Sequence, residues 1–398
     1  MKIDTNSEKI DDLLSRSVKE VLPSKEELRA VLVSGKRMKI YIGTDATGTS
    51  LHLGHATNYL ILEKFRQLGH EVIFLIGDFT SRIGDPTDKK DVARKQLTRE
   101  EVVVHTKTWI DQVRPIIDVD NVENPVTILF NHDWLAKLTF EDILNLASHF
   151  TVQQMIERDM FEKRMQENKP LYLHELFYPL MQGYDSVAMD VDIEMCGSDQ
   201  KFNALAGRTL LKKLKNKEKF VLITTLLENP ITGEKMMSKS LGTGVFLDCD
   251  AITMYGGVMA QADENMKQLF VDCTLVPYAQ IDAFLEAENP RDAKMHLAFE
   301  ITRMYHGESE ALRAQESFVE TFQKGNVPED VLEVRMPYIE SIISAGVVPS
   351  KAELRRLIDA GGVRDAHTGS KCTTFPEIVT EPCVLKIGKR RFVKLLPE

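Results

Sequence analysis

A strand–loop–helix–strand pattern in residues 37–78 constrains the fold of this chain more than any other feature of its sequence. A short apolar run at 40–42 predicts a buried strand, and apolar residues at helical spacing after residue 53 predict a helix. Gly69 ends that helix, and the run VIFLI at 72–76 predicts a second buried strand. A strand, a helix and a strand within about 40 residues indicate a right-handed βαβ unit of a nucleotide-binding parallel sheet. The unit contains no GxGxxG, which argues against a dinucleotide site.

The loop–helix junction of this unit carries the sequence HLGH. A helix start exposes unpaired N–H groups and the positive end of the helix dipole, which suit phosphate groups. His52 and His55 are three residues apart and so share one helical face, and Gly54 leaves room for a base or a sugar. The spacing favours a nucleoside triphosphate held by two imidazoles; two surface histidines at an ordinary helix start are the alternative.

Composition indicates a soluble globular protein. The 398 residues predict two or three domains, and 43% apolar with 28% charged residues can form real cores. No apolar run approaches 18 residues, and the first residues are charged, so we expect neither a membrane span nor a secretory leader. The five cysteines include no CxxC pair, which favours free thiols in a reducing cytosol over disulfides or a zinc site.

The net charge of −10 is unevenly distributed. Residues 338–398 contain 10 basic and 7 acidic residues, whereas the rest of the chain contains 40 and 53. A basic tail on an acidic body indicates an appendage that binds a polyanion, with an ordinary solvated surface as the alternative. A capping box predicts a helix at 351–360 in this tail, and a strand follows at 384–394.

Polar side chains follow three of the predicted strands, at the edge where ligands of open α/β sheets bind. Residues 78–89 form a loop in which Asp85 is either part of a Pro turn or an anchor for an ammonium group. A strand at 126–130 ends in NHDW, and a strand at 193–196 ends in GSDQ. We therefore expect a binding site at the carboxyl edge of the sheet.

A predicted helix within residues 171–192 carries a polar stripe on an otherwise apolar surface. Tyr178, Gln182 and Asp185 stand at i, i+4 and i+7, so they share one face. Because buried polar groups need partners, the stripe favours a ligand-facing surface over a wet helix face.

Helical patterns fill most of the remaining chain. We expect amphipathic helices at 9–32, helices that form a core or a subunit contact at 140–165, a basic helix at 210–220 and a small helical domain at 250–330. A loop rich in Gly, Ser and Lys at 232–242 is either solvent-facing surface or a phosphate clamp.

HLGH, GSDQ and MMSKS, in this order, resemble the signatures of class I aminoacyl-tRNA synthetases. Within that family, YIGTDATGTSLHLGH, IGDPT, YPLMQGYD and GSDQKFN make the chain most similar to the bacterial tyrosyl-tRNA synthetases. The resemblance covers essentially the whole chain. It implies an α/β fold with a Rossmann-like parallel-sheet catalytic domain at 1–228, with inserted dimerisation and acceptor-binding helices at about 130–165. An all-α anticodon-binding domain with the MMSKS loop would follow at 229–336, and a small α+β S4-like RNA-binding domain at 337–398.

The resemblance also implies roles for individual residues. Those implied to hold the amino acid tyrosine are Tyr41, Thr80, Asp85, Tyr178, Gln182, Asp185 and Gln200. Those implied to bind ATP are Asp45, His52, Gly54, His55, Asp199, Ser238, Lys239 and Ser240. The catalytic groups among or beside them are His52, His55, Lys89 and Lys239. In the tail, the implied RNA contacts are Arg355, Arg356, Lys389, Arg390 and Arg391.

One departure from the family pattern lies in the lysine loop. The usual KMSKS has a lysine where this chain has Met236, and Lys235 lies one residue earlier. The role of the first lysine in this chain is therefore open.

The implied reaction is the ATP-dependent activation of L-tyrosine, followed by transfer to the 3′ end of tRNA(Tyr). The implied enzyme is a cytoplasmic homodimer without membrane contact, with Mg²⁺ bound through the ATP phosphates and no metal ligand from the protein. Asp185 can accept and Tyr41 can donate a hydrogen bond, so the pair suits a phenol hydroxyl. The alternatives are a tryptophanyl-tRNA synthetase, a small nucleotidyltransferase that also uses HxGH, and a catalytically inactive RNA-binding relative.

Overall fold

The structure of the chain is a computed structural model, which describes residues 2–45, 48–84, 98–157, 159–237, 244–286, 289–322, 331–366, 368–388 and 391–397. It contains two compact units, residues 1–308 and 309–398, and each is described by itself. Within the described residues, no helix combines the length and the apolar character that a membrane crossing requires.

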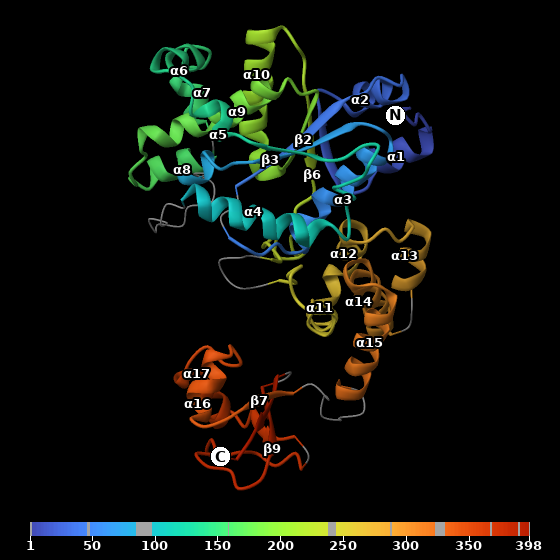
Figure 1. Ribbon diagram of the computed structural model, residues 1–398, viewed down its shortest axis with the longest axis vertical. Coiled ribbons are helices and arrows are strands. Elements are labelled where there is room, and N and C mark those ends of the chain that lie inside the picture. Colours follow the sequence, from blue (N-terminus) through green and yellow to red (C-terminus); the bar gives the residue numbers. More distant parts are fainter. Residues whose placement is uncertain are drawn as a thin grey trace. The chain divides into compact units, whose positions relative to one another are not determined.

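A mixed sheet forms the centre of the first unit (Figure 1). Its described strands follow the order β1-β6-β5-β2-β3-β4; β2 to β6 run parallel, and β1 is antiparallel to β6. The bounds are β1 Val18–Leu22, β2 Lys39–Thr44, β3 Glu71–Ile76, β4 Thr127–Phe130, β5 Ile193–Gly197 and β6 Phe220–Thr224. The helix α3 (Leu53–Gln67) joins β2 to β3, so the predicted βαβ unit and parallel-sheet fold are confirmed.

Two segments of this sheet differ from the sequence-based expectation. Residues 18–22, expected to be helical, form β1 between α1 (Ser7–Ser15) and α2 (Lys25–Val33). β1 lies at the edge of the sheet, where few of its side chains are buried. Its exposed charged residues therefore resemble the polar face of an amphipathic helix. Residue 220, expected to end a basic helix, instead begins β6, because the helix α10 (Lys201–Lys215) starts and ends earlier.

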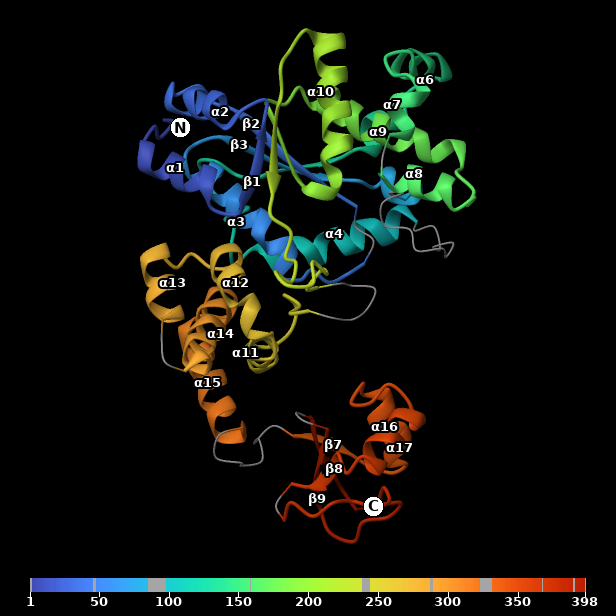
Figure 2. The same cartoon turned by 180° about the vertical axis from the view of Figure 1, so that it is seen from behind.

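Helices cover both faces of the sheet, as a parallel sheet requires. In Figures 1 and 2, α9 (Leu173–Met189) and α10 lie on one side, and α3 and α4 (Arg99–Val113) lie on the other. The helices α9 and α10 approach closely at Gly183 and Gly207: an added Cβ at Gly183 would lie 3.1 Å from the backbone N of Gly207. The region at 140–165, predicted to be helical, consists of α6 (Phe140–Ala147), α7 (Val152–Ile156) and α8 (Asp159–Gln166), after the short α5 (His132–Leu135).

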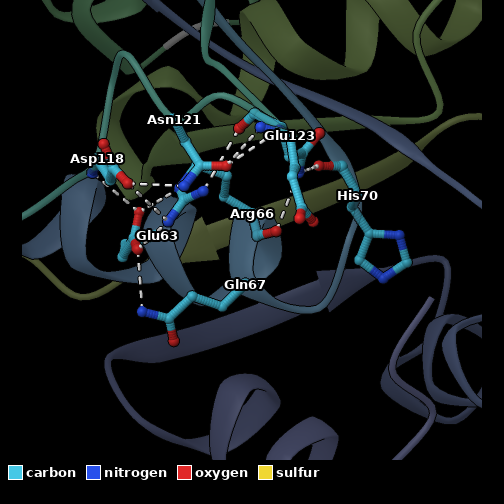
Figure 3. A network of polar contacts seen from close by, with 8 residues as sticks. Glu63, Arg66, Gln67, His70, Asp118, Asn121 and Glu123 are labelled. Atoms are coloured by element: carbon cyan, nitrogen blue, oxygen red, sulfur yellow. Dashed lines mark hydrogen bonds and ion pairs between the residues drawn. The ribbon is translucent and has the colours of Figure 1, made fainter. Parts of the chain in front are cut away.

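A network of polar contacts fixes the end of α3 to the loop before β4 (Figure 3). The Arg66 guanidinium donates to both carboxylate oxygens of Glu63, at 2.7 and 2.6 Å. Asn124 donates to the carbonyls of Arg66 and His70, both at 2.9 Å. The buried His70 ring accepts the backbone N–H of Met38 at 3.2 Å, and this contact links the turn to the start of β2. The network therefore holds β2 and β3 in register from their amino ends.

The later part of the first unit is helical, as predicted, with α11 (Ala251–Met259), α12 (Met266–Cys273), α13 (Tyr278–Leu285) and α14 (Pro290–His306). The buried guanidinium of Arg16, just before β1, donates to the carbonyls of Phe270, Val271 and Val276. A single side chain from the start of the chain thus satisfies carbonyls at the end of α12, which have no partner within the helix.

The second unit contains α15 (Glu308–Phe322) from residue 309 onward, and a described sheet of order β7-β10-β9-β8. Its strands are β7 Leu332–Val334, β8 Val363–Asp365, β9 Cys383–Ile387 and β10 Arg391–Leu395, accompanied by α16 (Tyr338–Ser344) and α17 (Lys351–Asp359). Ile342, Leu354, Ile387 and Val393 are among the residues of its own core. The pairing of β7 with β10 brings residues 332–334, which precede the boundary expected at 337, into this sheet.

Candidate active site

Several of the predicted ATP and tyrosine residues that the structure describes lie near the carboxyl ends of the parallel strands. From β2 the chain continues to β3 and β4 on one side of the sheet, whereas β5 and β6 occupy the other side. The neighbouring strands β2 and β5 therefore mark the point where the strand order reverses, which is where open α/β sheets bind ligands. Asp45 follows β2, and Asp199 follows β5.

Three predicted residues meet at the end of β2. Asp45 accepts hydrogen bonds from the Thr80 hydroxyl at 2.7 Å and from the Tyr178 hydroxyl at 3.0 Å. A side chain at Gly77 would overlap both the Asp45 carboxylate and the Thr80 hydroxyl, so this close arrangement requires glycine. The family resemblance groups Asp45 with ATP, but the contacts of Asp45 are with two residues predicted to hold the amino acid. A carboxylate beside two hydroxyl groups can bind an ammonium group.

Asp185 lies buried beneath the ends of β3 and β4. Trp134 donates from its indole Nε1 to one Asp185 oxygen at 2.7 Å, and Asn131 donates to the other at 3.3 Å. Burial raises the pKa of Asp185 well above its usual range; the two donors oppose this shift, and the negative charges of Glu194 and Asp45 add to it. Trp134 and Asn131 were not predicted as site residues, although the NHDW sequence after β4 signalled polar groups at this edge.

Tyr41 in β2 is fully buried, and its hydroxyl lies 2.9 Å from the Ser186 hydroxyl. Burial, together with the charges of Glu194 and Asp185, raises the pKa of Tyr41 well above its usual range. The phenol therefore stays neutral and keeps a proton to share. The family resemblance places Tyr41 and Asp185 together at the phenol, and nothing in the sequence indicates Ser186.

A chain of amides links two further predicted residues. Gln182 donates to the Glu194 carboxylate at 3.1 Å, and Asn203 donates to the side-chain oxygens of Gln182 at 3.0 Å and Gln200 at 2.8 Å. Tyr178, Gln182 and Asp185, the polar stripe predicted on this helix, each have a protein hydrogen-bond partner: Asp45, Glu194 and Trp134. The alternative of a solvent-facing helix surface is therefore wrong for these three residues. Glu194 and Asn203 could not be singled out from the sequence, because nothing local marks them.

The two histidines of HLGH lie next to each other at the start of α3. His52 is the N-cap, and its Nδ1 accepts the Gly54 N–H at 3.2 Å, while the Nδ1 of His55 accepts the His52 N–H at 3.2 Å. The ring centroids are 3.9 Å apart, which agrees with the predicted shared face. An Nδ1 that accepts an N–H carries no proton, so each neutral ring is a donor at Nε2. A Cβ at Gly54 would lie 3.1 Å from the His52 ring, so this glycine leaves room for that ring.

Lys235 reaches Asp199, one of the residues predicted to bind ATP. Its ammonium lies 3.2 Å from an Asp199 oxygen, whereas the backbone N–H of Met236 donates to the Leu227 carbonyl at 2.9 Å. The predicted residues Asp85, Lys89, Ser238, Lys239 and Ser240 lie outside the residues that the structure describes.

Three of the five tail residues implied to contact RNA are described, all in the second unit. Arg355 and Arg356 are exposed on α17, and Arg356 also donates to Glu353 at 2.9 Å. Arg391 is exposed at the start of β10 and donates to the carbonyl of Val347. Lys389 and Arg390 lie outside the described residues.

Comparison with known proteins gives a consistent result. A family model described as tRNA synthetases class I (W and Y) matches residues 34–323. The tyrosine–tRNA ligase of Moorella thermoacetica is 40% identical over 96% of this chain and 94% of its own length. That of Carboxydothermus hydrogenoformans is 39% identical over 97% of both chains.

Solved structures share the fold. A C-terminally truncated mitochondrial tyrosyl-tRNA synthetase of Aspergillus nidulans has a TM-score of 0.64 at 23% identity, over 79% of this chain and 94% of that one. The tyrosyl-tRNA synthetase of Archaeoglobus fulgidus, complexed with L-tyrosine, has a TM-score of 0.59 at 19% identity, over 78% of this chain and 100% of that one. At such low identities, the likeness concerns the fold alone.

Proposed function

Because this chain belongs to the class I tRNA synthetases for tryptophan and tyrosine, we propose that the carboxyl edge of β2 and β5 is where it activates its amino acid. The enzyme is a tyrosine–tRNA ligase, and its substrates are ATP, L-tyrosine and tRNA(Tyr). The tyrosine carboxylate attacks the α-phosphorus of ATP and expels pyrophosphate. A terminal ribose hydroxyl of the tRNA then attacks the tyrosyl-adenylate.

Asp185 is the observation that carries the assignment of the phenol subsite. A buried carboxylate with two fixed donors keeps lone pairs that can accept a phenol proton. Phenylalanine would leave this carboxylate without that partner, and an unsatisfied buried polar group is costly. Tyr41 would contact the same hydroxyl from β2.

We place the ammonium group of tyrosine beside Asp45, Thr80 and Tyr178, whose contacts with one another support a single subsite. This proposal moves Asp45 from the ATP site to the amino acid site. Gln182 and Gln200 would hold the rest of the amino acid through the shared Asn203. The sequence also predicts that Asp85 contributes here.

ATP would bind at the start of α3, with His52 and His55 donating to its phosphates and Asp199 contacting its ribose. Gly54 would leave the helix start open, while Lys89, Ser238, Lys239 and Ser240 would close on the leaving pyrophosphate. Mg²⁺ would arrive with ATP and be held mainly by phosphate oxygens and water. No protein nucleophile is needed, since alignment and donors aimed at the developing charge lower the barrier.

Exchange of labelled pyrophosphate into ATP tests this function. The enzyme is given tyrosine, tryptophan or phenylalanine separately, and tyrosine alone should support exchange. Exchange with tryptophan in place of tyrosine would overturn the specificity, and no exchange with any of the three would favour the inactive RNA-binding alternative.

We further propose that two copies of the chain associate through the helices at about 130–165. Exposed apolar side chains support this: Phe140 and Leu144 on α6, Val152 on α7 and Met165 on α8. Light scattering of the full chain should give a dimer, and Phe140→Asp combined with Val152→Asp should give a monomer. A monomeric, active parent enzyme would refute the proposal.

The remaining parts of the chain would serve tRNA. Residues 229–336 would bind the anticodon region, and the S4-like tail would contact RNA through Arg355, Arg356, Lys389, Arg390 and Arg391. Arg355→Glu with Arg356→Glu should raise the KM for tRNA and leave pyrophosphate exchange unchanged; an unchanged KM would contradict this role. The five cysteines are unpaired, which supports a cytoplasmic location.

A further inference from the structure

A fully buried ion pair lies behind the proposed tyrosine subsite. Lys219, just before β6, forms it with Glu194 of β5, and their side chains are 0% and 2% exposed. Removing two charged groups from water is costly, and the cost is recovered only with good geometry and further hydrogen bonds. The further partners of this pair therefore indicate what it does.

Both residues of the pair reach side chains of the proposed tyrosine subsite. The Lys219 ammonium donates to the Ser186 hydroxyl at 2.9 Å, and Ser186 lies 2.9 Å from the Tyr41 hydroxyl. The Glu194 carboxylate accepts the Gln182 amide at 3.1 Å. One ion pair thus lies behind both the residue that would contact the phenol and a residue that would hold the body of tyrosine.

Hydrogen-bond directions follow from the chemistry of each group. A lysine ammonium only donates, so Ser186 accepts from Lys219 and keeps its own single proton. That proton can go to the Tyr41 oxygen at 2.9 Å or to Glu194 at 3.3 Å, and the shorter contact favours Tyr41. Tyr41 then accepts from Ser186, which leaves its own proton for the oxygen of a bound phenol.

The surrounding backbone leaves space for this arrangement only because residue 207 is glycine. A Cβ there would lie 2.6 Å from the Lys219 nitrogen, 2.9 Å from the Ser186 oxygen and 3.3 Å from a Glu194 oxygen. All three groups thus meet one bare backbone position in α10, which fixes where the ammonium can lie.

We propose that Lys219 is a positioning residue for tyrosine recognition: through Ser186 it orients the Tyr41 hydroxyl as a donor to the substrate phenol, and with Glu194 it holds the Gln182 amide. This inference rests on the proposed phenol subsite. It requires that Lys219, which would not touch the substrate, affects how strongly the enzyme prefers tyrosine over phenylalanine.

The test uses the full-length chain and the ratio of kcat/KM for tyrosine to that for phenylalanine in pyrophosphate exchange. Lys219→Met combined with Glu194→Gln removes both charges, so no unpaired charge is left buried, and a side-chain oxygen for Gln182 is kept. The ratio should fall by roughly tenfold, the typical loss when one hydrogen bond in recognition is misdirected, while the KM for ATP stays unchanged. Lys212→Met, which breaks the exposed pair with Glu218, is the matched control and should leave the ratio unchanged.

Ser186→Ala distinguishes positioning from a merely structural role. It removes the intermediate hydroxyl while leaving the ion pair, and it should lower the ratio by a similar factor. Combining it with Lys219→Met and Glu194→Gln should lower the ratio no further, because the pair would act on Tyr41 through that hydroxyl. The inference would be overturned if the combined variant lowered the ratio by the product of the two separate factors. It would also be overturned if Ser186→Ala left the ratio unchanged.

Cooperative thermal unfolding checks that each variant is folded. If the doubly substituted variant does not fold, Ser186→Ala decides the question by itself. If the unaltered enzyme shows no tyrosine-dependent exchange, the proposed function is wrong. If the unaltered enzyme is active but the variants keep its preference for tyrosine over phenylalanine, only the positioning role of Lys219 is wrong.

Discussion

The indole nitrogen of Trp134 lies 2.7 Å from a carboxylate oxygen of Asp185, and both groups lie beneath the carboxyl ends of β3 and β4. The contact joins residues that are 51 positions apart in the sequence. Trp134 is itself held in place, because Asp78 accepts the backbone N–H of His132 at 2.9 Å and Asn131 accepts that of Phe79 at 2.9 Å. The orientation of the proposed phenol acceptor is therefore set by the short helix α5.

Replacing Trp134 with Phe should weaken tyrosine binding. The substitution removes the indole donor and keeps an aromatic ring, and hydrogen bonds to charged groups are worth about 1.5–3 kcal/mol. We expect the KM for tyrosine in pyrophosphate exchange to rise about tenfold or more, with the KM for ATP unchanged. Equal losses for tyrosine and phenylalanine would show that Trp134 shapes the pocket without orienting Asp185.

Tyrosine binding should depend on pH through Asp185. Burial raises the pKa of this carboxyl, so it takes up a proton at a higher pH than an ordinary aspartate. The ionised form accepts the phenol proton, so the KM for tyrosine should rise as the pH falls through the raised pKa. In Asp185→Asn this step should be absent, and a step that persists there would have to be assigned to another group.

His52→Asn should separate the two roles of His52. Asn is a good N-cap, whereas Ala at this position costs about 1 kcal/mol of stability. Both His52→Asn and His52→Ala should lose kcat for exchange by roughly 100-fold, since both lack the imidazole donor. Only the Ala variant should unfold at a lower temperature. As a control, Ser24→Ala removes the N-cap of α2 and should lower stability without affecting the rate.

Much of the site could be predicted because it is marked by local patterns. The strands β2 and β3 are each a run of adjacent apolar residues, which predicts a buried strand. HLGH is likewise a short contiguous sequence, and its position at a predicted helix start indicates a binding role. Asn131 and Trp134 belong to the NHDW sequence that follows β4, so the sequence marks this edge of the sheet without singling out either residue.

Other features depend on pairings that no local pattern reveals. Glu194 lies in β5, Ser186 in α9 and Lys219 just before β6, and only the register of β5 against β6 and the approach of α9 to α10 bring them together. Residues 18–22 read as part of an amphipathic helix because a strand at a sheet edge keeps a wet face. Its pairing with β6, some 200 positions away, overrides that pattern.

Lys235 should contribute to adenylate formation in place of the lysine that is absent at Met236. Its ammonium lies beside Asp199, and this exposed pair is weak enough to yield to a nucleotide. Lys235→Met should slow exchange about tenfold, since one cation near the phosphates is lost. Lys267→Met, on the exposed surface of α12, should leave the rate unchanged.

Moving the lysine one position should not restore activity. Lys235 forms a β-bridge with Glu228, and neighbouring residues of an extended chain point to opposite sides. Lys235→Met combined with Met236→Lys should therefore remain as slow as Lys235→Met, and full recovery would contradict the placement of Lys235.

His70 should make the fold less stable in acid. Burial, with the positive charge of Arg37 adding to it, lowers the pKa of His70 to about 4. The unfolded state binds a proton near pH 6.5, so the stabilising contribution is complete above that pH and is lost as the pH falls toward 4. Across this range, the free energy of unfolding should fall by about 3 kcal/mol more in the parent than in His70→Asn. Urea titrations at several pH values measure this, and the exposed His174→Asn should behave like the parent.

Because β1 pairs with β6, a minimal catalytic fragment must include β1. The family match begins at residue 34, yet the strand that closes one edge of the catalytic sheet ends at Leu22, and Arg16 before it reaches the carbonyls at the end of α12. A fragment trimmed to residues 34–323 would lack β1, so the backbone groups along one edge of β6 would be unpaired and open to pairing with strands of other molecules. It would also lack the hydrogen bonds from Arg16 to α12. Truncations meant for expression or crystallisation should therefore be made at the other end of the chain.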